Sequence, residues 1–343
     1  MELPLPSELP PSFLVEIADE YGTPTYITSA STVRERYDEL RDAFPDARIQ
    51  YAAKANTNPR ILEILREKGA TVDAVSLGEV VAAKRAGFDS DDIMYTGVNP
   101  PEGELEGVLE RNVTVNADSF SGLERIADIA SDAGTTEIGI RVNPEVGAGH
   151  HKKVITGGKG SKFGVAERRV VEAYEHADKL GLNPVGIHMH IGSGIKESEP
   201  LIEAVSKLDE IARDVEAAGF ELEYFDIGGG LGVPYHPDDG RLDLDTVADG
   251  IRDVYDLDAR LVIEPGRYLV AESTVLLTRV NTIKERPGND FVGVDAGFNT
   301  LLRPAMYDSY HHITNLSSDD EPPSRNRRRE TFLPFIPPVR TDS

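Results

Sequence analysis

Short apolar runs alternate with amphipathic runs along the chain from about residue 49. The apolar runs are rich in Val, Ile and Tyr, and turn residues bound them, as is typical of β-strands. Eight strands are predicted in this way, at 49–56, 70–76, 92–97, 113–118, 137–144, 184–192, 224–230 and 260–266. The amphipathic runs place apolar residues at i, i+3, i+4 and i+7, and most end in glycine. They predict helices at 59–69, 77–87, 119–134, 166–181 and 199–219, with a weaker pattern at 243–256.

Eight strands that alternate with helices over about 220 residues are typical of an α/β fold of the (β/α)₈ TIM-barrel type. The alternative is an open, doubly wound parallel sheet. The count of eight favours a closed barrel. Because a helix pattern at 29–44 precedes the first of these strands, the barrel domain is predicted to span 29–271.

The pattern changes after the barrel. Runs at 274–286 and 290–297 read as strands with no helix between them, which predicts the start of an all-β domain over 272–316. Residues 1–28 contain one more strand pattern, TPTYIT, and are expected to join that domain.

The last segment, 317–343, is rich in Pro, Arg and Ser, and it predicts an irregular tail rather than packed structure. The β domain is therefore expected to be partial and incomplete at its C-terminal end. The basic run RNRRR at 325–329 is interpreted as part of a solvated tail rather than a nucleic-acid site.

Composition narrows the class of protein. The chain has 343 residues, of which 39% are hydrophobic and 28% charged, and it contains no cysteine. Disulfides, thiolate metal sites and a cysteine nucleophile are thereby excluded. The formal net charge of −24 repels phosphate and anionic lipid, so no nucleic-acid or membrane partner is expected. Such an acidic surface is also what a protein from a high-salt cytoplasm would carry. The N-terminus lacks the pattern of a signal peptide, which predicts a cytoplasmic protein.

In a TIM barrel the active site forms where the strands end, and the unusual residues of this chain fall there. Lys54 ends the first strand between Ala52, Ala53 and Ala55. Burial in the barrel mouth would lower the pKa of this amine and favour a Schiff base. The alternative is a lysine whose amine reaches out to solvent at the rim.

Three glycines, Gly228, Gly229 and Gly230, end the seventh strand, where barrels often bind phosphate. Glycine lets backbone N–H groups close around an anion, although a tight turn has the same sequence. Ser193 could supply one more donor.

An acid, Glu264, emerges from the apolar eighth strand and calls for a cationic partner. A protonated ring nitrogen would serve, and so would an ion pair with Arg267 or Arg141. Arg141 ends the fifth strand and Asp73 lies in the second, where each could orient groups in the mouth or form a core ion pair.

Two histidines, His188 and His190, alternate on the sixth strand and therefore face one side. They could bind a metal, for which His236, His311 and His312 are possible further ligands, or one ring could stack on an aromatic cofactor. No metal is expected. A reactive lysine, a phosphate cradle, a flat ring contact and an acid for a ring nitrogen together describe a pyridoxal 5'-phosphate site.

The sequence resembles the diaminopimelate decarboxylases of the alanine-racemase-like, fold type III group of pyridoxal-phosphate enzymes. The resemblance covers about residues 13–316. It rests on the motifs YAAKAN, RVNPEVGAGHH, KFGV, HMHIGSG, DIGGGLGVPY, EPGRYLV and DAGFNTLLRPAMYDSYHHI. The last motif separates this family from the ornithine and arginine decarboxylases of the same fold.

The resemblance implies a role for each matching residue. Lys54 would bind the cofactor covalently, His190 would stack on its ring, and Glu264 would pair with its ring nitrogen. The residues that would complete the cofactor site are Asp73, Arg141, Ser193, Gly228, Gly229, Gly230, Pro265, Gly266 and Arg267. Arg267, Arg303 and Tyr307 would hold the distant carboxylate of the substrate.

The implied reaction is the decarboxylation of meso-2,6-diaminopimelate to L-lysine and CO₂, the last step of lysine biosynthesis, by a homodimer. Family members continue well past the Tyr307 region and carry a Cys-Glu-Ser-Gly-Asp motif that completes the partner subunit's site. This chain has no match to that motif, which predicts a truncated or frameshifted C-terminus. Four alternatives stay open: a catalytically impaired remnant, a decarboxylase for another basic amino acid, a metal hydrolase that uses His188 and His190, and a Schiff-base aldolase without cofactor.

Overall fold

The structure is a computed structural model that describes residues 5–6, 8–130, 136–146, 162–236, 238–287 and 289–316. The predicted tail 317–343 lies outside the described residues. The chain divides into two compact units. The barrel unit comprises Val33–Val233 and Arg241–Val270, and the β unit comprises Met1–Thr32, Pro234–Gly240 and Ala271–Ser343.

Eight parallel strands close into a ring in the barrel unit. They are β2 (Arg48–Ala52), β3 (Thr71–Ala74), β4 (Ile93–Tyr95), β5 (Thr114–Ala117), β6 (Thr136–Asn143), β8 (Leu182–Met189), β9 (Tyr224–Asp226) and β10 (Arg260–Ile263). The ring closes because β10 pairs with β2 as well as with β9, and β5 pairs with β6. A short strand, β7 (Val165–Ala166), lies beside β6. The predicted (β/α)₈ barrel is confirmed, and the open doubly wound sheet is wrong.

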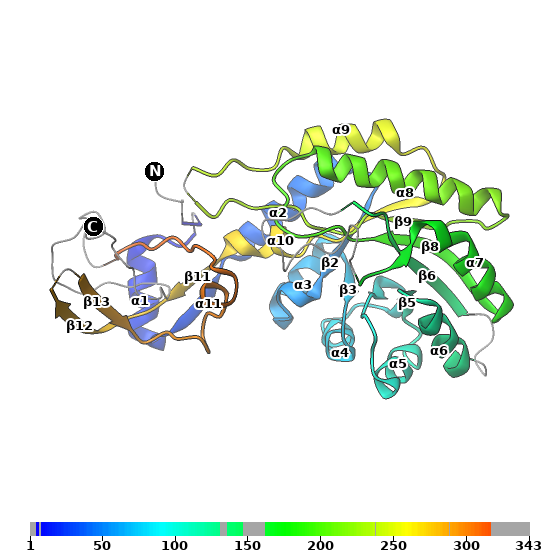
Figure 1. Cartoon of the computed structure of the whole chain (residues 1–343). Coiled ribbons are helices and arrows are strands. Elements are labelled where there is room, and N and C mark those ends of the chain that lie inside the picture. The colour runs from blue at the N-terminus through cyan, green and yellow to red at the C-terminus, as the bar shows by residue number, and fades with distance from the viewer. Residues whose placement is uncertain are drawn as a thin grey trace. The chain divides into compact units, whose positions relative to one another are not determined.

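Helices surround these strands on the outside of the barrel (Figure 1). They are α2 (Ala30–Ala43), α3 (Pro59–Lys68), α4 (Leu77–Arg85), α5 (Glu102–Leu109), α6 (Phe120–Ala130), α7 (Val170–Lys179), α8 (Glu199–Ala217), α9 (Leu244–Val254) and the short α10 (Arg267–Val270). Helix α3 shows why the pattern is readable: Asn58 accepts a hydrogen bond from the N–H of Arg60, Pro59 opens the helix, and Gly69 ends it in the left-handed conformation.

The barrel centre is filled by an aromatic ring rather than left open. The hydroxyl of Tyr224 donates to Oδ1 of Asn116 over 2.8 Å, and both side chains are buried. A β-carbon on Gly186 would overlap the Tyr224 ring, and one on Gly139 would overlap the Asn116 amide. The two glycines therefore leave space for this pair, and the barrel is a packed core rather than a pore.

The β unit contains α1 (Pro11–Tyr21), β1 (Thr25–Thr28), β11 (Thr274–Leu277), β12 (Val280–Arg286), β13 (Asn289–Val294) and α11 (Arg303–Tyr307). β1 pairs antiparallel with β11, and β12 pairs antiparallel with β13. An apolar cluster of Leu9, Leu14, Ala18 and Leu277 packs α1 against the sheet of β1 and β11. The run 274–286, predicted as one strand, is two strands because its halves pair with different partners.

None of the helices among the described residues is both long enough and apolar enough to cross a lipid bilayer.

Candidate active site at the barrel mouth

Lys54 lies in a single 3₁₀ turn, Ala53–Ala55, immediately after β2 rather than within the strand. Its Nζ lies 2.7 Å from Oδ2 of Asp73, which is on the neighbouring strand β3. Asp73 is completely buried, whereas the Lys54 side chain is 45% exposed at the barrel mouth. The hydroxyl of Thr96, just after β4, donates to the other oxygen of Asp73. Neighbouring strands thus hold the amine at the open end of the barrel.

The electrostatic surroundings of Lys54 overturn one prediction. Burial by itself lowers the pKa of the amine, as the sequence suggested. The attraction of Asp73, and then of Glu264, outweighs this effect, so the pKa of Lys54 is raised above its ordinary value. The amine is therefore held as an ammonium against Asp73. The prediction that burial lowers the pKa of Lys54 is wrong because it leaves out the carboxylate of Asp73 on the next strand.

The loop that contains Glu264 packs directly against the turn that contains Lys54. The N–H of Ala52 donates to the carbonyl of Pro265 over 3.2 Å. A β-carbon on Gly266 would lie 3.1 Å from the β-carbon of Ala52 and 3.2 Å from that of Ala55. The small neighbours of Lys54 are thus required by the close approach of this loop. Arg267 follows as the first residue of α10.

The glycine triplet lies just past the end of β9, which stops at Asp226. Gly228 and Gly230 have positive φ angles of 69° and 101°. A β-carbon on Gly229 would overlap the carbonyl oxygen of Glu264, and one on Gly230 would overlap that of Gly192. The triplet therefore fits between the Glu264 loop and the loop of Gly192 and Ser193, where only glycine leaves room.

Two N–H groups of the triplet have acceptors within the protein. Gly228 donates to Oδ1 of Asp226 over 2.8 Å, and Gly229 donates to Nδ1 of His190 over 3.2 Å. An Nδ1 that accepts a hydrogen bond carries no proton, so the His190 ring is the neutral tautomer with its proton on Nε2. Burial, together with the charges of Lys54 and Arg141, lowers the pKa of His190 to about 3. The ring is neutral at physiological pH.

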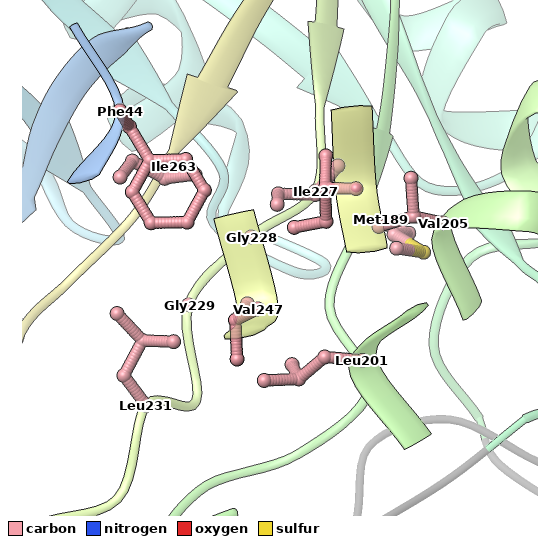
Figure 2. Close-up of a pocket in the computed structure, with 11 residues that line it drawn as sticks. Phe44, Met189, Leu201, Val205, Ile227, Gly228, Gly229, Leu231, Val247 and Ile263 are labelled. Atoms are coloured by element: carbon pink, nitrogen blue, oxygen red, sulfur yellow. The ribbon is translucent and has the colours of Figure 1, made fainter. Parts of the chain in front are cut away.

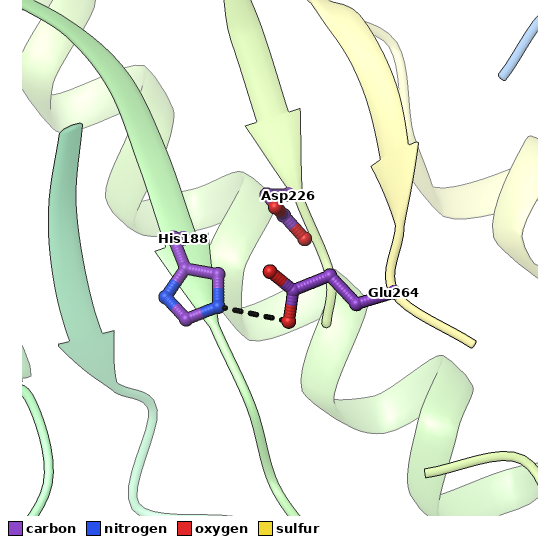
Figure 3. Close-up of side chains that lie close together, drawn as sticks. All are labelled: His188, Asp226 and Glu264. Atoms are coloured by element: carbon purple, nitrogen blue, oxygen red, sulfur yellow. Dashed lines mark hydrogen bonds and ion pairs between the residues drawn. The ribbon is translucent and has the colours of Figure 1, made fainter. Parts of the chain in front are cut away.

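Glu264 is buried at the same strand ends, and its Oε2 faces Nε2 of His188 across 3.4 Å (Figure 3). Burial alone would raise the pKa of this carboxyl group, but His188 and Lys54 lower it to about 2. Glu264 is therefore an anion. The sequence offered Arg267 or Arg141 as its internal partner, whereas the contact that the structure gives is with His188, on β8.

Arg141 is buried on β6 beside His188 in the strand register, and its guanidinium lies 4.9 Å from the centre of the Phe163 ring. Burial lowers the pKa of this guanidinium, while Glu264 and Asp73 oppose the shift. Even so, an arginine stays charged in proteins. Arg141 therefore adds positive charge to the same site as the two acids.

Three buried groups, His188, Asp226 and Glu264, each offer one ligand atom within 4.8 Å of the others. The sequence suggested that further metal ligands would be His236, His311 and His312, but these residues belong to the β unit. The groups beside His188 are the carboxylates of Asp226, which ends β9, and Glu264, which directly follows β10.

Gly228 and Gly229 of the triplet also line an apolar hollow (Figure 2). It has a volume of about 10 Å³ and is lined by Phe44, Met189, Leu201, Val205, Ile227, Gly228, Gly229, Leu231, Val247, Ile251 and Ile263. That is about the space of one water, and apolar hollows of this size stay dry. It is a packing gap between the strand ends and helices α8 and α9 rather than a ligand site.

Arg303 and Tyr307, predicted to hold the substrate carboxylate, are the first and last residues of helix α11 in the β unit. The Arg303 guanidinium lies 5.0 Å from the centre of the Tyr235 ring, and that ring meets His311 edge-on. Nη2 of Arg303 also donates to Ser309. Sequence reasoning did not single out Tyr235, nor Thr96 beside Asp73. The position of Thr96 at a strand end was a usable signal.

Comparison with known proteins agrees with this arrangement. The sequence profile of the pyridoxal-dependent decarboxylases, for their pyridoxal-binding domain, matches residues 30–271. The diaminopimelate decarboxylase of Methanothermobacter thermautotrophicus is 52% identical over 312 residues, which are 87% of this chain and 72% of that protein. The chain belongs to the diaminopimelate decarboxylase family.

Other relatives support the same conclusion. The diaminopimelate decarboxylase of Aquifex aeolicus is 39% identical, over 95% of this chain and 77% of its own length. The crystal structure of the diaminopimelate decarboxylase of Helicobacter pylori complexed with L-lysine has a TM-score of 0.86 and 36% identity. That comparison covers 94% of this chain and 86% of the other.

The residues of this family member fit pyridoxal phosphate, its cofactor. The barrel mouth brings together an amine for the aldehyde, a buried anion for a protonated ring nitrogen, and a neutral imidazole for a flat ring face. The glycine triplet lets the Glu264 loop and the Gly192 loop approach its own loop at this point, while the N–H groups of Gly228 and Gly229 have acceptors within the protein. The role of each residue stays a prediction.

Proposed function

We propose that this chain decarboxylates meso-2,6-diaminopimelate and releases L-lysine and CO₂, with pyridoxal 5'-phosphate as cofactor. In this reaction one bond from an α-carbon to a carboxylate breaks, CO₂ leaves, and a proton takes its place. The observation that supports the proposal most is the juxtaposition of Lys54 with Asp73 at the strand ends that also hold Glu264 and the glycine triplet.

Bound pyridoxal phosphate supplies a positively charged ring that accepts the electron pair left at the α-carbon when CO₂ departs. The protein keeps that ring charged through Glu264. Because its pKa is about 2, this carboxylate is a weak base and leaves a proton on the ring nitrogen. A charge-assisted hydrogen bond of this kind contributes about 1.5–3 kcal/mol.

Lys54 and Asp73 act on the cofactor's aldehyde side. Asp73 orients the amine, because its Oδ2 accepts a hydrogen bond from Nζ of Lys54 over 2.7 Å. The neutral ring of His190, fixed by Gly229, offers a flat face without adding positive charge. Arg141 and Ser193 complete the cofactor site in this proposal.

Substrate choice depends on the end of the molecule that does not react. Diaminopimelate carries a second carboxylate there, and two arginines with a phenol suit a carboxylate well. Arg267, Arg303 and Tyr307 are proposed to bind it. A basic amino acid without a second carboxylate would give these three residues nothing of that kind to bind.

We propose that the enzyme is a cytoplasmic homodimer, in line with its resemblance to the diaminopimelate decarboxylases. Light scattering of the purified holoenzyme tests the dimer, because a monomer at all accessible concentrations would contradict it.

The cofactor assignment is tested by absorption spectroscopy and by mass after borohydride reduction. We expect the cofactor to be fixed on Lys54 by reduction, and Lys54→Ala to lose that adduct. Lys68→Ala is the matched control, since Lys68 forms a similar 2.7 Å pair with Asp38 on the outside of the barrel. An unchanged adduct in Lys54→Ala would refute the assignment.

The reaction is tested by measuring lysine and CO₂ from meso-diaminopimelate, and by measuring CO₂ in separate assays that offer lysine, ornithine or arginine instead. Turnover with diaminopimelate alone supports the proposal. Cofactor binding without turnover would instead favour the catalytically impaired remnant.

A further inference from the structure

The buried carboxyl groups of Asp226 and Glu264 face each other at the ends of β9 and β10 (Figure 3). Asp226 is 0% exposed and Glu264 is 4% exposed. One carboxylate oxygen of each residue lies within 4.8 Å of one from the other. Two ionised carboxylates repel strongly in a buried site, so such a pair ordinarily keeps one proton between its members.

The hydrogen bonds of the pair show where that proton belongs. Oδ1 of Asp226 accepts from the N–H of Gly228, and Oε2 of Glu264 faces His188. The remaining oxygens, Oδ2 of Asp226 and Oε1 of Glu264, are both buried and have no hydrogen-bond partner among the described residues. Buried polar atoms without partners are rare. One proton between these two oxygens satisfies both.

The neighbouring charges decide which residue holds the proton. Glu264 is beside His188 and is attracted by the Lys54 ammonium, and both favour its anion. Asp226 is surrounded mainly by other acids, Glu264 and Asp73. Burial and the Glu264 charge raise the pKa of Asp226 well above its ordinary value, while that of Glu264 falls to about 2. Further groups that act on the pair are Arg48, Arg141 and Tyr224.

We propose that Asp226 is a neutral carboxylic acid that donates a hydrogen bond from Oδ2 to Oε1 of Glu264, and that it is a positioning residue for this anion. The donated bond stops the Glu264 carboxylate from rotating and weakens it as a base. The importance of this weaker basicity rests on the proposed function, in which Glu264 must not remove the proton from the cofactor ring nitrogen. Because Oδ1 of Asp226 accepts a hydrogen bond from Gly228, Asp226 also links Glu264 to the glycine triplet.

Infrared spectroscopy of the holoenzyme tests the protonation state without any turnover. We expect the carbonyl stretch of a neutral carboxylic acid at pH 7, and its loss in Asp226→Asn. Asp209→Asn is the matched control, because Asp209 is also buried but pairs with Arg213 over 2.7 Å. A band absent from the wild type, or unchanged in Asp226→Asn, overturns the proposal.

The positioning role is tested by a pair of variants. Asp226→Leu removes the donor, so we expect cofactor affinity to fall about 10- to 100-fold, as for one hydrogen bond to a charged group. The acid limb of the kcat/KM profile should also move to higher pH, because Glu264 becomes more basic. Asp226→Asn presents an N–H at the same place and should restore both. A merely structural role would leave the acid limb unmoved, and that result overturns the proposal.

Two further results are decisive. Stoichiometric divalent metal in the purified protein would place an ion where the proton is expected and overturn the inference. An Asp226→Asn protein that fails to fold would do the same, because the amide reproduces the hydrogen bonds of a neutral acid. A protein with the infrared band but no decarboxylation rejects the proposed function and leaves the protonated Asp226 standing.

Discussion

Asp73 and Lys54 form an ion pair between adjacent strand ends, with the carboxylate fully buried and the amine open to the barrel mouth. The same carboxylate positions the amine and raises its pKa. An amine held as an ammonium reacts with an aldehyde only after it loses a proton, so Asp73 sets the pH at which the cofactor can be loaded.

The first prediction concerns this pair. In Asp73→Asn the largest attraction on the ammonium is removed, so burial prevails and the pKa of Lys54 falls. The pH midpoint for covalent binding of pyridoxal phosphate, followed by its absorption, should therefore shift down. Asp38→Asn is the control, since Asp38 pairs with Lys68 away from the mouth. An unchanged or higher midpoint in Asp73→Asn would show that Asp73 does not control the amine.

The second prediction concerns the contact of Gly229 with the backbone of Glu264. Gly229→Ala places a methyl group onto that carbonyl oxygen, and backbone cannot move aside as a flexible side chain can. We expect the free energy of unfolding to fall by about 2 kcal/mol or more, together with weaker cofactor binding. Gly240→Ala is the control because nothing lies within 4 Å of its added carbon. Equal denaturation midpoints for the two variants would contradict the packing argument.

The third prediction concerns the proposed grip on the substrate. Arg303→Ala should raise KM for meso-diaminopimelate about 10- to 100-fold, the effect of one lost hydrogen bond to a charged group. The cofactor spectrum should stay unchanged. Arg279→Ala, which removes an exposed ion pair with Asp19, is the control. A fall in kcat with constant KM would assign Arg303 a different role. Tyr235→Leu should show a weaker form of the Arg303→Ala effect, because its ring lies against the guanidinium.

The fourth prediction concerns stability against pH. His190 has a pKa of about 3 in the folded protein, against about 6.5 in an unfolded chain. The unfolded state therefore binds the extra proton between these values, and the stability that His190 contributes is lost as pH falls below 6.5. The loss from one such group is up to about 1.4 kcal/mol per pH unit.

Urea denaturation of the cofactor-free protein at pH 7, 6 and 5 checks this slope. His190→Gln should reduce it, while His236→Gln, at an exposed ring, should not. His311, whose pKa burial lowers to about 4, contributes a slope of the same sign that remains in both variants. An unaltered slope in His190→Gln would contradict the assigned neutral ring.

Local sequence was sufficient for the barrel. The eight strands are short runs of residues that favour extended structure, and the helix ends carry their own signals, as Asn58, Pro59 and Gly69 show. Helix α5 was not predicted because it is only eight residues long and contains two glycines, so its apolar spacing is weak. Helix α1 was also missed, although Pro11 and Gly22 mark its ends.

The rule that strand ends carry the site places Lys54, Glu264 and Gly228 in it from the sequence alone. What each group contacts depended on strands far apart in the chain. Asp73 reverses the expected pKa shift of Lys54, and His188, rather than a nearby arginine, faces Glu264. The pairing of Asp226 with Glu264 likewise exists only because β9 and β10 are neighbours in the ring. Sequence patterns report local backbone preference, whereas ionisation depends on charges within a few ångströms, and only the closed barrel brings those charges together.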